Sequence, residues 1–401
     1  MNPPVRLHLL VESSSDVRLI EELAERFDLR VVARRRQGGV EISQAPRSPV
    51  AVLTGPAGRA AFARLVAAVL WRERRGEDVV VAQGYGLGAL AANVIGRLTG
   101  VPTAMLVCSP IEAYYRCRRE QLGPQPRFRG FELAALAVIA RLNARLGTHY
   151  VVLSEYLAGV VRSHGTRARV DVVPVYGVDT SVFCPSDEDR AAIRRRRGLP
   201  VDATLIFFSS RIAPEKDAES ALLAVRSLRD HGREVVLVNR SGGWRELLAA
   251  AHRFGVGDNV IATDAVHPYL DLPDDYRACD LCVQASREEG LGFSVLEALA
   301  CETPVVAASV GGLRETVVDG RTGWLYPSRD PETLAARIAE VLDDPLEARR
   351  RAASGRQLVR ERYERRPVFD EFERILIERI DSSPSPHLRR RRRTGERTPV
   401  P

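Results

Sequence analysis

Two cations in the second half of the chain have the types and spacing that bind an anion. Arg211 and Lys216 lie five positions apart in a loop that follows the apolar run 205–209. An arginine offers a planar fork to a phosphate and a lysine a point charge, and amides at the start of a following helix add to both. The pair predicts a phosphate or diphosphate site. The alternative is a solvated loop in which Lys216 pairs with Glu215 or Asp217.

The composition singles out Lys216 independently. The chain holds 59 lysines and arginines in total, and Lys216 is its single lysine. Such a skew indicates pressure, typical of a GC-rich genome, to replace lysine wherever arginine can serve. A lysine that resists replacement is expected where a compact ammonium is needed rather than a planar fork. Chance survival of one lysine is the alternative.

A second segment places two glutamates around a glycine-rich turn. Glu289, Gly290, Gly292 and Glu297 follow the apolar run 281–284 and lead into a helix that ends near residue 301. Glycines let a backbone approach a ligand closely, and carboxylates accept hydrogen bonds from vicinal sugar hydroxyls. Ser294 and Glu297 also fit a helix capping box, which would give Glu297 a purely structural role.

Glu289 and Glu297, with seven residues between them, resemble the paired glutamates of the retaining glycosyltransferases of the GT-B fold, family 4, also called glycosyl transferases group 1. Arg211 and Lys216 resemble the Arg-x4-Lys signature of the same family. The resemblance extends in order and spacing over roughly residues 150–342, in segments 173–179, 304–306, 311–312 and 319–323.

The resemblance implies transfer of a hexosyl unit from a nucleoside-diphosphate sugar, UDP- or GDP-hexose, with retention of configuration. The acceptor would be a hydroxyl of a glycan, a lipid-linked molecule or a small molecule. No metal is implied, and no cofactor besides the sugar nucleotide as co-substrate. The family pattern implies that Arg211 and Lys216 contact the diphosphate. It also implies that Glu289 binds the sugar hydroxyls and Glu297 the ribose. The backbone amides that face the sugar or the phosphates would come from Gly290, Leu291, Gly292 and Phe293. Arg240 stands near the expected nucleotide, within reach of a phosphate or the base.

The first half of the chain departs from the family pattern. Ser13–Ser15 replaces the usual glycine pair, the histidine near the fourth strand is missing, and Tyr176 stands where asparagine is common. These loops face the acceptor in the family, so the resemblance does not identify the acceptor. The acceptor-side candidates are Ser14, Tyr85, Glu112, Tyr114 and Arg116, the last three in a loop; simple loop packing is the alternative for these three.

Continuous apolar runs alternate with amphipathic helical patterns along both halves, which is typical of parallel sheets covered on both faces. The expected strands are 6–11, 29–33, 50–53, 79–82, 103–107, 150–153 and 170–174, then 205–209, 235–239, 260–263, 281–284, 304–308 and 323–326. We predict an α/β protein of two tandem Rossmann-like, doubly wound domains (GT-B) that face a central cleft. The expected parts are an N-terminal acceptor-side domain (1–183), a charged linker (184–200), a C-terminal nucleotide-sugar domain (201–366), a helix (367–381) that can pack back on the N-terminal domain, and a disordered tail (382–401).

Charge and hydropathy exclude several classes. The net charge is +7, but residues 383–401 carry +5 of it, so the folded body is nearly neutral and unlike a nucleic-acid platform. The longest apolar stretch, 133–140, is too short to span a membrane, and residues 1–4 lead directly into the strand-like run 6–11 without the pattern expected of a secretory signal. We expect a cytoplasmic protein in which Cys279 and Cys282 pack in the core rather than bind metal.

One surface leaves membrane contact open. Arg116, Arg118, Arg119, Arg127 and Arg129 form a basic cluster that fits either a solvated loop or peripheral binding to the inner face of an anionic membrane. Two further functions compete with glycosyl transfer. They are a nucleotide-sugar epimerase on the same fold, and a non-catalytic protein that binds an anion or a membrane.

Overall fold

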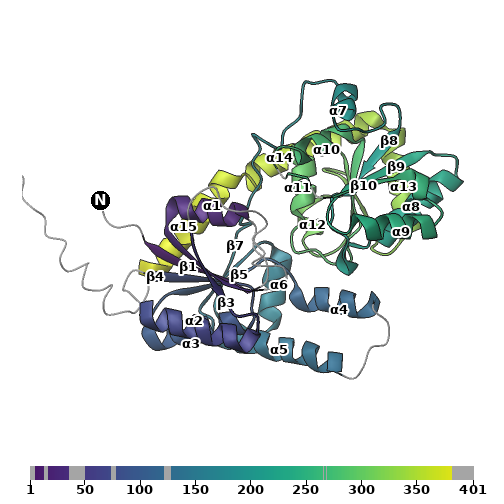
Figure 1. Cartoon of the computed structure of the whole chain (residues 1–401). Coiled ribbons are helices and arrows are strands. Elements are labelled where there is room, and N and C mark those ends of the chain that lie inside the picture. The colour runs from purple at the N-terminus through teal and green to yellow at the C-terminus, as the bar shows by residue number, and fades with distance from the viewer. Residues whose placement is uncertain are drawn as a thin grey trace, which may run out of the picture. The chain divides into compact units, whose positions relative to one another are not determined.

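The computed structural model describes residues 5–12, 17–35, 50–73, 78–121, 128–264, 266–267 and 269–381. Ser14, the Ser13–Ser15 segment and the tail 382–401 lie outside these residues. The chain forms two compact units (Figure 1). Unit 1 comprises Met1–Ser109, Arg127–Tyr176 and Val368–Pro401, and unit 2 comprises Pro110–Pro126 and Gly177–Pro367.

Unit 1 is built on a seven-stranded parallel sheet in the order β3-β2-β1-β4-β5-β6-β7. Its central strands read as unbroken apolar runs because helices cover both faces, and every residue of β4 and β5 is buried. The elements are β1 (Arg6–Val11), α1 (Val17–Arg26), β2 (Asp28–Arg34), β3 (Ala51–Gly55), α2 (Arg59–Glu73), β4 (Asp78–Gln83), α3 (Leu87–Thr99), β5 (Thr103–Val107), α5 (Phe128–Leu146), β6 (His149–Val152), α6 (Glu155–Ser163), β7 (Arg169–Val172) and most of α15 (Arg365–Asp381).

Unit 2 repeats the plan with a six-stranded parallel sheet in the order β10-β9-β8-β11-β12-β13. Buried apolar side chains on one face of this sheet, among them Ile206, Leu237, Val283 and Val306, form a core with the helices packed against that face. The elements are α4 (Ile111–Gln121), α7 (Arg190–Arg196), β8 (Thr204–Phe207), η1 (Pro214–Lys216), α8 (Ala218–Asp230), β9 (Val235–Arg240), α9 (Trp244–Arg253), η2 (Gly257–Asn259), β10 (Val260–Thr263), α10 (Leu272–Ala278), β11 (Leu281–Gln284), α11 (Phe293–Ala300), β12 (Val305–Ala308), α12 (Leu313–Thr316), β13 (Trp324–Tyr326), α13 (Pro331–Asp343) and α14 (Pro345–Arg362).

The two doubly wound parallel sheets confirm the predicted fold class. In each unit the strand order reverses direction at one point, between β1 and β4 and between β8 and β11. In an open sheet of this kind, ligands bind at the carboxyl ends of the strands beside the reversal point. In unit 2 this places a ligand site at the loops after β8 and β11.

The predicted linker 184–200 is folded into unit 2. Its arginine run forms α7, and the buried side chain of Arg194 donates hydrogen bonds to the carbonyls of Ala278 (2.8 Å) and Val201 (2.7 Å) and pairs with Asp280 (2.9 Å). The sequence pattern of this charged run suggests exposure to solvent. In the fold, Arg194 of this run is instead buried against backbone carbonyls and the Asp280 carboxylate. The chain also passes between units at Tyr176–Gly177 and at Pro367–Val368, and it places Pro110–Pro126 in unit 2.

The last helix returns to unit 1, where its residues from Val368 onward belong. Arg26, at the end of α1, pairs with Asp370 (2.8 Å) and Glu373 (2.9 Å) of α15, so these two helices lie side by side. Within the described part of the chain, no helix combines the length and apolar character needed to cross a membrane. Cys279 and Cys282 are free thiols buried in unit 2, which confirms the core-packing interpretation.

Candidate donor site

The loop after β8 is held in place by one buried amide. Asn239, at the end of β9, donates hydrogen bonds from its side chain to the carbonyls of Phe208 (2.7 Å) and Ser210 (2.9 Å). The Ser241 hydroxyl donates a further bond of 2.7 Å to the Ser210 carbonyl. Because these carbonyls are fixed, the backbone that carries Arg211 leaves the sheet in a defined direction. No motif in the sequence points to this role of Asn239.

Arg211 pairs with a buried carboxylate that a second arginine also holds. Its exposed side chain donates to Glu215 at 3.0 Å, and Glu215 has no exposed surface. Arg118, from α4, donates to both oxygens of the same carboxylate at 2.9 and 3.3 Å. Burial by itself raises the pKa of Glu215, but the Arg118 hydrogen bonds and the charges of Arg118 and Arg211 hold it below the usual value. Glu215 is therefore ionised and shared between two guanidinium groups.

Lys216 joins the first predicted segment to the second. Its ammonium donates to Oε2 of Glu289, and both side chains are largely buried. The predicted alternative, a pairing of Lys216 with Glu215 or Asp217, is wrong. The same Glu289 oxygen accepts hydrogen bonds from the Gln284 amide (3.1 Å) and the Ser286 hydroxyl (3.2 Å).

The other oxygen of Glu289 faces α4. The Tyr114 hydroxyl donates to Glu289 Oε1 at 3.4 Å. Burial, together with the negative charges of Glu289 and Glu215, raises the pKa of Tyr114 well above the usual value. The phenol therefore stays protonated and acts as a donor to the carboxylate.

The glycine-rich turn has the close approaches that the sequence suggests. Gly292 adopts φ +95°, a conformation that favours glycine, and it begins α11. A Cβ on Gly312 would lie 2.3 Å from the carbonyl oxygen of Gly290, so the two backbones touch. The side chain of Leu291 is buried and that of Phe293 is partly buried. The turn places backbone amides at the start of α11, next to Glu289.

Glu297 is not part of a capping box. Gly292, rather than Ser294, caps α11, and no side chain caps it; the Ser294 hydroxyl instead donates to Gln284 at 3.1 Å. Glu297 is buried and accepts a hydrogen bond of 3.1 Å from the hydroxyl of Tyr276. That hydroxyl also lies 2.7 Å from Ser209 Oγ at the end of β8, so Tyr276 connects the two loops.

Tyr276 is a site residue that sequence reasoning missed. It has no exposed surface, and burial together with the Glu297 charge raises its pKa well above the usual value, so it remains a neutral donor. Its position in α10 gives no motif signal because it reads as an ordinary core tyrosine. Only its hydroxyl contacts distinguish it.

Arg240 is part of an ion-pair network. Its guanidinium lies 3.1 Å from the carboxylate of Asp275, which is fully buried, and it donates to the Arg197 carbonyl at 2.7 Å. Arg197 pairs with the same carboxylate at 2.9 Å. Burial raises the pKa of Asp275, and the two arginines offset this only in part. Arg240 is thus committed to a structural partner rather than extended toward the loops after β8 and β11.

The segment expected as a loop around Glu112 and Tyr114 is the helix α4, which the contacts place in unit 2. Tyr114 and Arg118 lie one turn apart and reach Glu289 and Glu215, whereas Arg116 is exposed on another face. Glu112 is in the first turn of α4. The predicted basic cluster is only partly observable, because Arg127 and the side chain of Arg129 lie outside the described residues and Arg118 is bound to Glu215.

Tyr85 belongs to the interior of unit 1. It is 4% exposed, and its ring centroid lies 5.6 Å from that of His164. Among the described residues, no group of three or more histidine, cysteine or carboxylate side chains is placed to hold a metal ion.

Two Rossmann-like units, one of which carries paired cations and glutamates at the carboxyl ends of its strands, define a GT-B-type protein. Solved structures share this fold. Sucrose-phosphate synthase from Thermosynechococcus elongatus aligns over 94% of this chain and all of its own, with a TM-score of 0.77 and 19% identity. HepE from Anabaena, crystallised in complex with UDP-glucose, aligns over 93% of this chain and 99% of its own, with a TM-score of 0.73 and 19% identity.

Comparison of the amino-acid sequence with protein families gives a match in the second half of the chain. Residues 189–358 match the family described as Glycosyl transferases group 1, and this part of the chain belongs to it. A D-inositol 3-phosphate glycosyltransferase from Xylanimonas cellulosilytica is 38% identical over 245 residues, 58% of this chain and 57% of that relative. One from Acidothermus cellulolyticus is 32% identical over 280 residues, 67% of this chain and 60% of that relative. The chain thus covers less than two thirds of the length of each of these relatives.

Proposed function

We propose that this protein transfers a hexosyl unit from a nucleoside-diphosphate sugar, UDP- or GDP-hexose, to a hydroxyl acceptor. The observation that carries the proposal is the placement of Arg211, Lys216 and Glu289 on the two loops beside the reversal point of unit 2, with Lys216 bonded to Glu289 and with Glu297 on the helix that follows the second loop. The family match of residues 189–358 supports it, as do the UDP-glucose bound to HepE and the glycosyltransferase names of the relatives.

The chemistry needs these residues for one reason. When the glycosidic bond breaks, negative charge accumulates on the departing diphosphate, and fixed cations and amide dipoles stabilise that charge. Arg211 and Lys216 supply the cations and residues 290–293 supply amides. Glu289, already hydrogen-bonded on Oε2 by Gln284 and Ser286, is suited to accept from sugar hydroxyls. Glu297 takes the ribose in this proposal.

We further propose that the reaction retains the anomeric configuration and needs no metal ion. The departing phosphate would accept the proton of the acceptor hydroxyl on the same face of the sugar, so that Glu289 positions the donor rather than attacks it. The anomer of the product, read by NMR, tests retention, and an inverted product would contradict the mechanism. Full turnover in the presence of excess EDTA is expected.

The decisive experiment has two stages. A thermal-shift screen over UDP- and GDP-sugars identifies the donor, because a ligand that binds the folded state raises the apparent melting temperature. Release of nucleoside diphosphate is then measured with hydroxyl acceptors, including inositol 3-phosphate. Wild type should release diphosphate and form a glycoside, and Lys216→Ala should lose this activity while the exposed Glu219→Ala on the same segment retains it.

The same assay separates the competing functions. An epimerase would return an altered sugar nucleotide without free diphosphate. A non-catalytic binding protein would turn over nothing, and its ligand binding would depend on the arginine-rich segment 383–401. Deletion of that segment should leave the turnover of a glycosyltransferase unchanged.

A further inference from the structure

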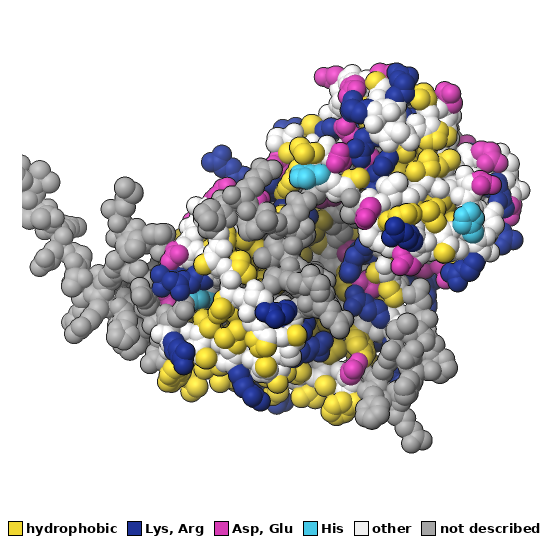
Figure 2. Space-filling model, viewed as in Figure 1, with side chains coloured by type: hydrophobic (Ala, Val, Ile, Leu, Met, Phe, Trp, Pro, Cys, Tyr) yellow, Lys and Arg dark blue, Asp and Glu magenta, His cyan; other side chains and the backbone are white. Residues whose placement is uncertain are grey.

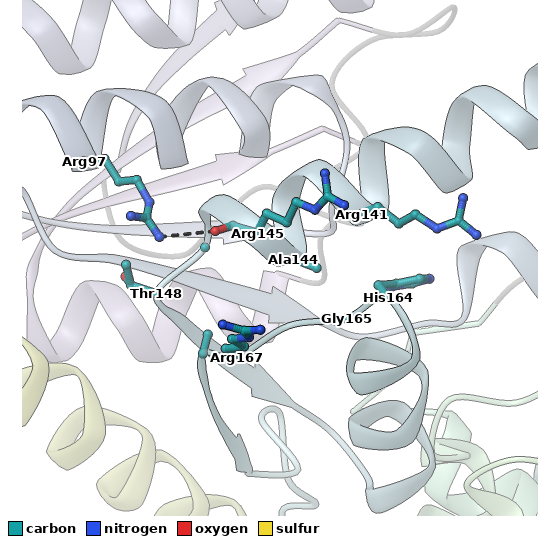
Figure 3. Close-up of a pocket in the computed structure, with 10 residues that line it drawn as sticks. Arg97, Arg141, Ala144, Arg145, Thr148, His164, Gly165 and Arg167 are labelled. Atoms are coloured by element: carbon teal, nitrogen blue, oxygen red, sulfur yellow. Dashed lines mark hydrogen bonds between the residues drawn. The ribbon is translucent and has the colours of Figure 1, made fainter.

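A second basic site lies in unit 1 and shares no residue with the proposed donor site of unit 2. A cavity of about 660 Å³ is lined by ten residues, which include four arginines and one histidine and no acidic residue. The basic side chains are Arg97, Arg141, Arg145, Arg167 and His164. Figure 3 shows Arg141 and Arg145 on α5, one turn apart, with His164 and Arg167 contributed by the end of α6 and the loop that follows it.

The cavity lies at the amino ends of the strands of unit 1. Thr148 and Ala168 line it, and each immediately precedes a strand, β6 and β7 respectively. In a parallel sheet all amino ends share one edge, opposite the carboxyl ends at which the acceptor-side loops after β4 and β5 begin. A ligand here would therefore occupy a site distinct from the acceptor side of the sheet.

Three of the arginines carry charge that no carboxylate offsets. Arg141, Arg145 and Arg167 are exposed and form no ion pair with an aspartate or glutamate of the described residues. Some other arginines of unit 1 are paired, as Arg26 is with Asp370 at 2.8 Å and Arg169 is with Asp171 at 2.7 Å. What distinguishes the cavity is that it gathers several arginines and a histidine with no carboxylate in its lining.

Structural roles at the end of α5 account for Arg97 and, in part, for Arg145. Arg97 donates to the carbonyls of Leu146 (2.7 Å) and Arg145 (3.2 Å), and so satisfies the end of α5. Cations near a helix C-terminus also stabilise the helix dipole. At α5 that effect is met by Arg97 and by Arg145, which lies in the last turn of the helix, and it does not require Arg167, which lies on a loop beyond α6.

We infer that this cavity binds a multiply charged anion of the phosphate class. Guanidinium groups match phosphate oxygens in pairs, and arginines that line one cavity without carboxylates attract an anion with at least two charges. A free phosphorylated small molecule and a phospholipid headgroup share this chemistry. Exposed apolar side chains, Leu98 on α3 and Leu142 on α5, directly follow Arg97 and Arg141 in the sequence, and Figure 2 shows hydrophobic and basic side chains interspersed over the face of α2, α3 and α5.

The test titrates inorganic pyrophosphate into the full chain by calorimetry. It is done in a Lys216→Ala background, which removes one cation of the proposed donor site, so the result does not depend on the proposed function. Arg145→Gln with Arg167→Gln should weaken pyrophosphate binding at least about tenfold, since each charge-assisted hydrogen bond is worth about that factor. Arg64→Gln, an exposed arginine of α2 outside the cavity, should not change binding.

A second arm identifies the source of the anion. Co-sedimentation is measured with vesicles of phosphatidylcholine alone and with phosphatidylglycerol added. Loss of binding to the anionic vesicles in the double variant and in Leu98→Ser indicates a headgroup, whereas a pyrophosphate effect without vesicle binding indicates a free phosphate compound. If the double variant, with an unchanged melting temperature, matches Arg64→Gln in both arms, or if neither probe binds, the inference is overturned.

Discussion

Replacing Arg118 by glutamine tests whether α4 forms part of the donor site. The substitution removes two hydrogen bonds, at 2.9 and 3.3 Å, from the fully buried carboxylate of Glu215 and leaves it one cation, Arg211, at 3.0 Å. A hydrogen bond to a charged group contributes about 1.5–3 kcal/mol. Arg118 is half-exposed, so water screens the pair, and Arg211 remains; we therefore expect a net loss of about 1–2 kcal/mol in the free energy of unfolding.

The same change should weaken donor binding. With Arg118 gone, Glu215 keeps Arg211 as its remaining cation, and Arg211 becomes less available to a diphosphate. A redistribution of about 1.4 kcal/mol corresponds to about a tenfold rise in KM for the nucleotide sugar. The turnover number should change less, because the substitution leaves Lys216 and the amides of the turn in place.

The pH dependence of the stability loss provides a check. The pKa of Glu215 is lowered in the folded protein, so its stabilising contribution is complete above the ordinary carboxyl pKa and is lost as the pH falls through the lower, folded value. The difference in melting temperature between wild type and Arg118→Gln should therefore be greatest near neutral pH and should close in acid.

The assay is a thermal melt across pH together with donor saturation kinetics, and Arg119→Gln is the matched control because Arg119 is exposed on the same helix. Equal melting curves and equal KM values for Arg118→Gln and Arg119→Gln near neutral pH would refute the reasoning. A difference that persists undiminished in acid would show that packing, rather than the Glu215 charge, is responsible.

Four further substitutions follow from the same geometry. Lys216→Ala should lower the turnover number about 10²-fold, by loss of one group that stabilises the leaving diphosphate, in steady-state diphosphate release. Glu297→Gln should weaken nucleotide binding about tenfold by calorimetry. Tyr276→Phe should lower the free energy of unfolding by about 1–2 kcal/mol in denaturant melts, because Glu297 loses a buried donor. Gly292→Ala should destabilise by about 1–3 kcal/mol in the same melts, since φ is +95° and a Cβ would lie 2.5 Å from Leu313, whereas Gly159→Ala in α6, with open space, should not.

The strands and the predicted donor loops followed from the sequence because their signals are local. Apolar runs bounded by turns predicted every strand of both sheets to within a few residues, and glycine-rich or charged segments after β8 and β11 predicted where Lys216 and Glu289 lie. Parallel strands then bring such loops to one edge without further information. The pairing of Lys216 with Glu289, 73 residues away, required the folded chain.

Helix α4 and the folding of 184–200 into unit 2 could not be predicted in this way. Hydrophobic periodicity reports which face of an element meets an apolar core. The face of α4 that carries Tyr114 and Arg118 instead meets carboxylates 175 and 97 residues away. Likewise Arg194 can be buried because it donates to backbone carbonyls and pairs with Asp280. A run of arginines in the sequence does not indicate these contacts. Contacts between polar residues that are distant in sequence do not change the spacing of apolar residues, so hydrophobic periodicity cannot predict them.

The arrangement of partners explains how two paired cations can still serve an incoming anion. A buried carboxylate left without a partner costs about 3–5 kcal/mol, which would hold each cation in place. If a diphosphate draws Arg211 from Glu215, Arg118 still donates to that carboxylate; if it draws Lys216 from Glu289, the donors Gln284, Ser286 and Tyr114 remain. Each cation can therefore exchange its carboxylate for a phosphate without leaving a buried carboxylate that has no hydrogen-bond donor. Helix α4 supplies one of the donors that stay in place in each case, Arg118 for Glu215 and Tyr114 for Glu289.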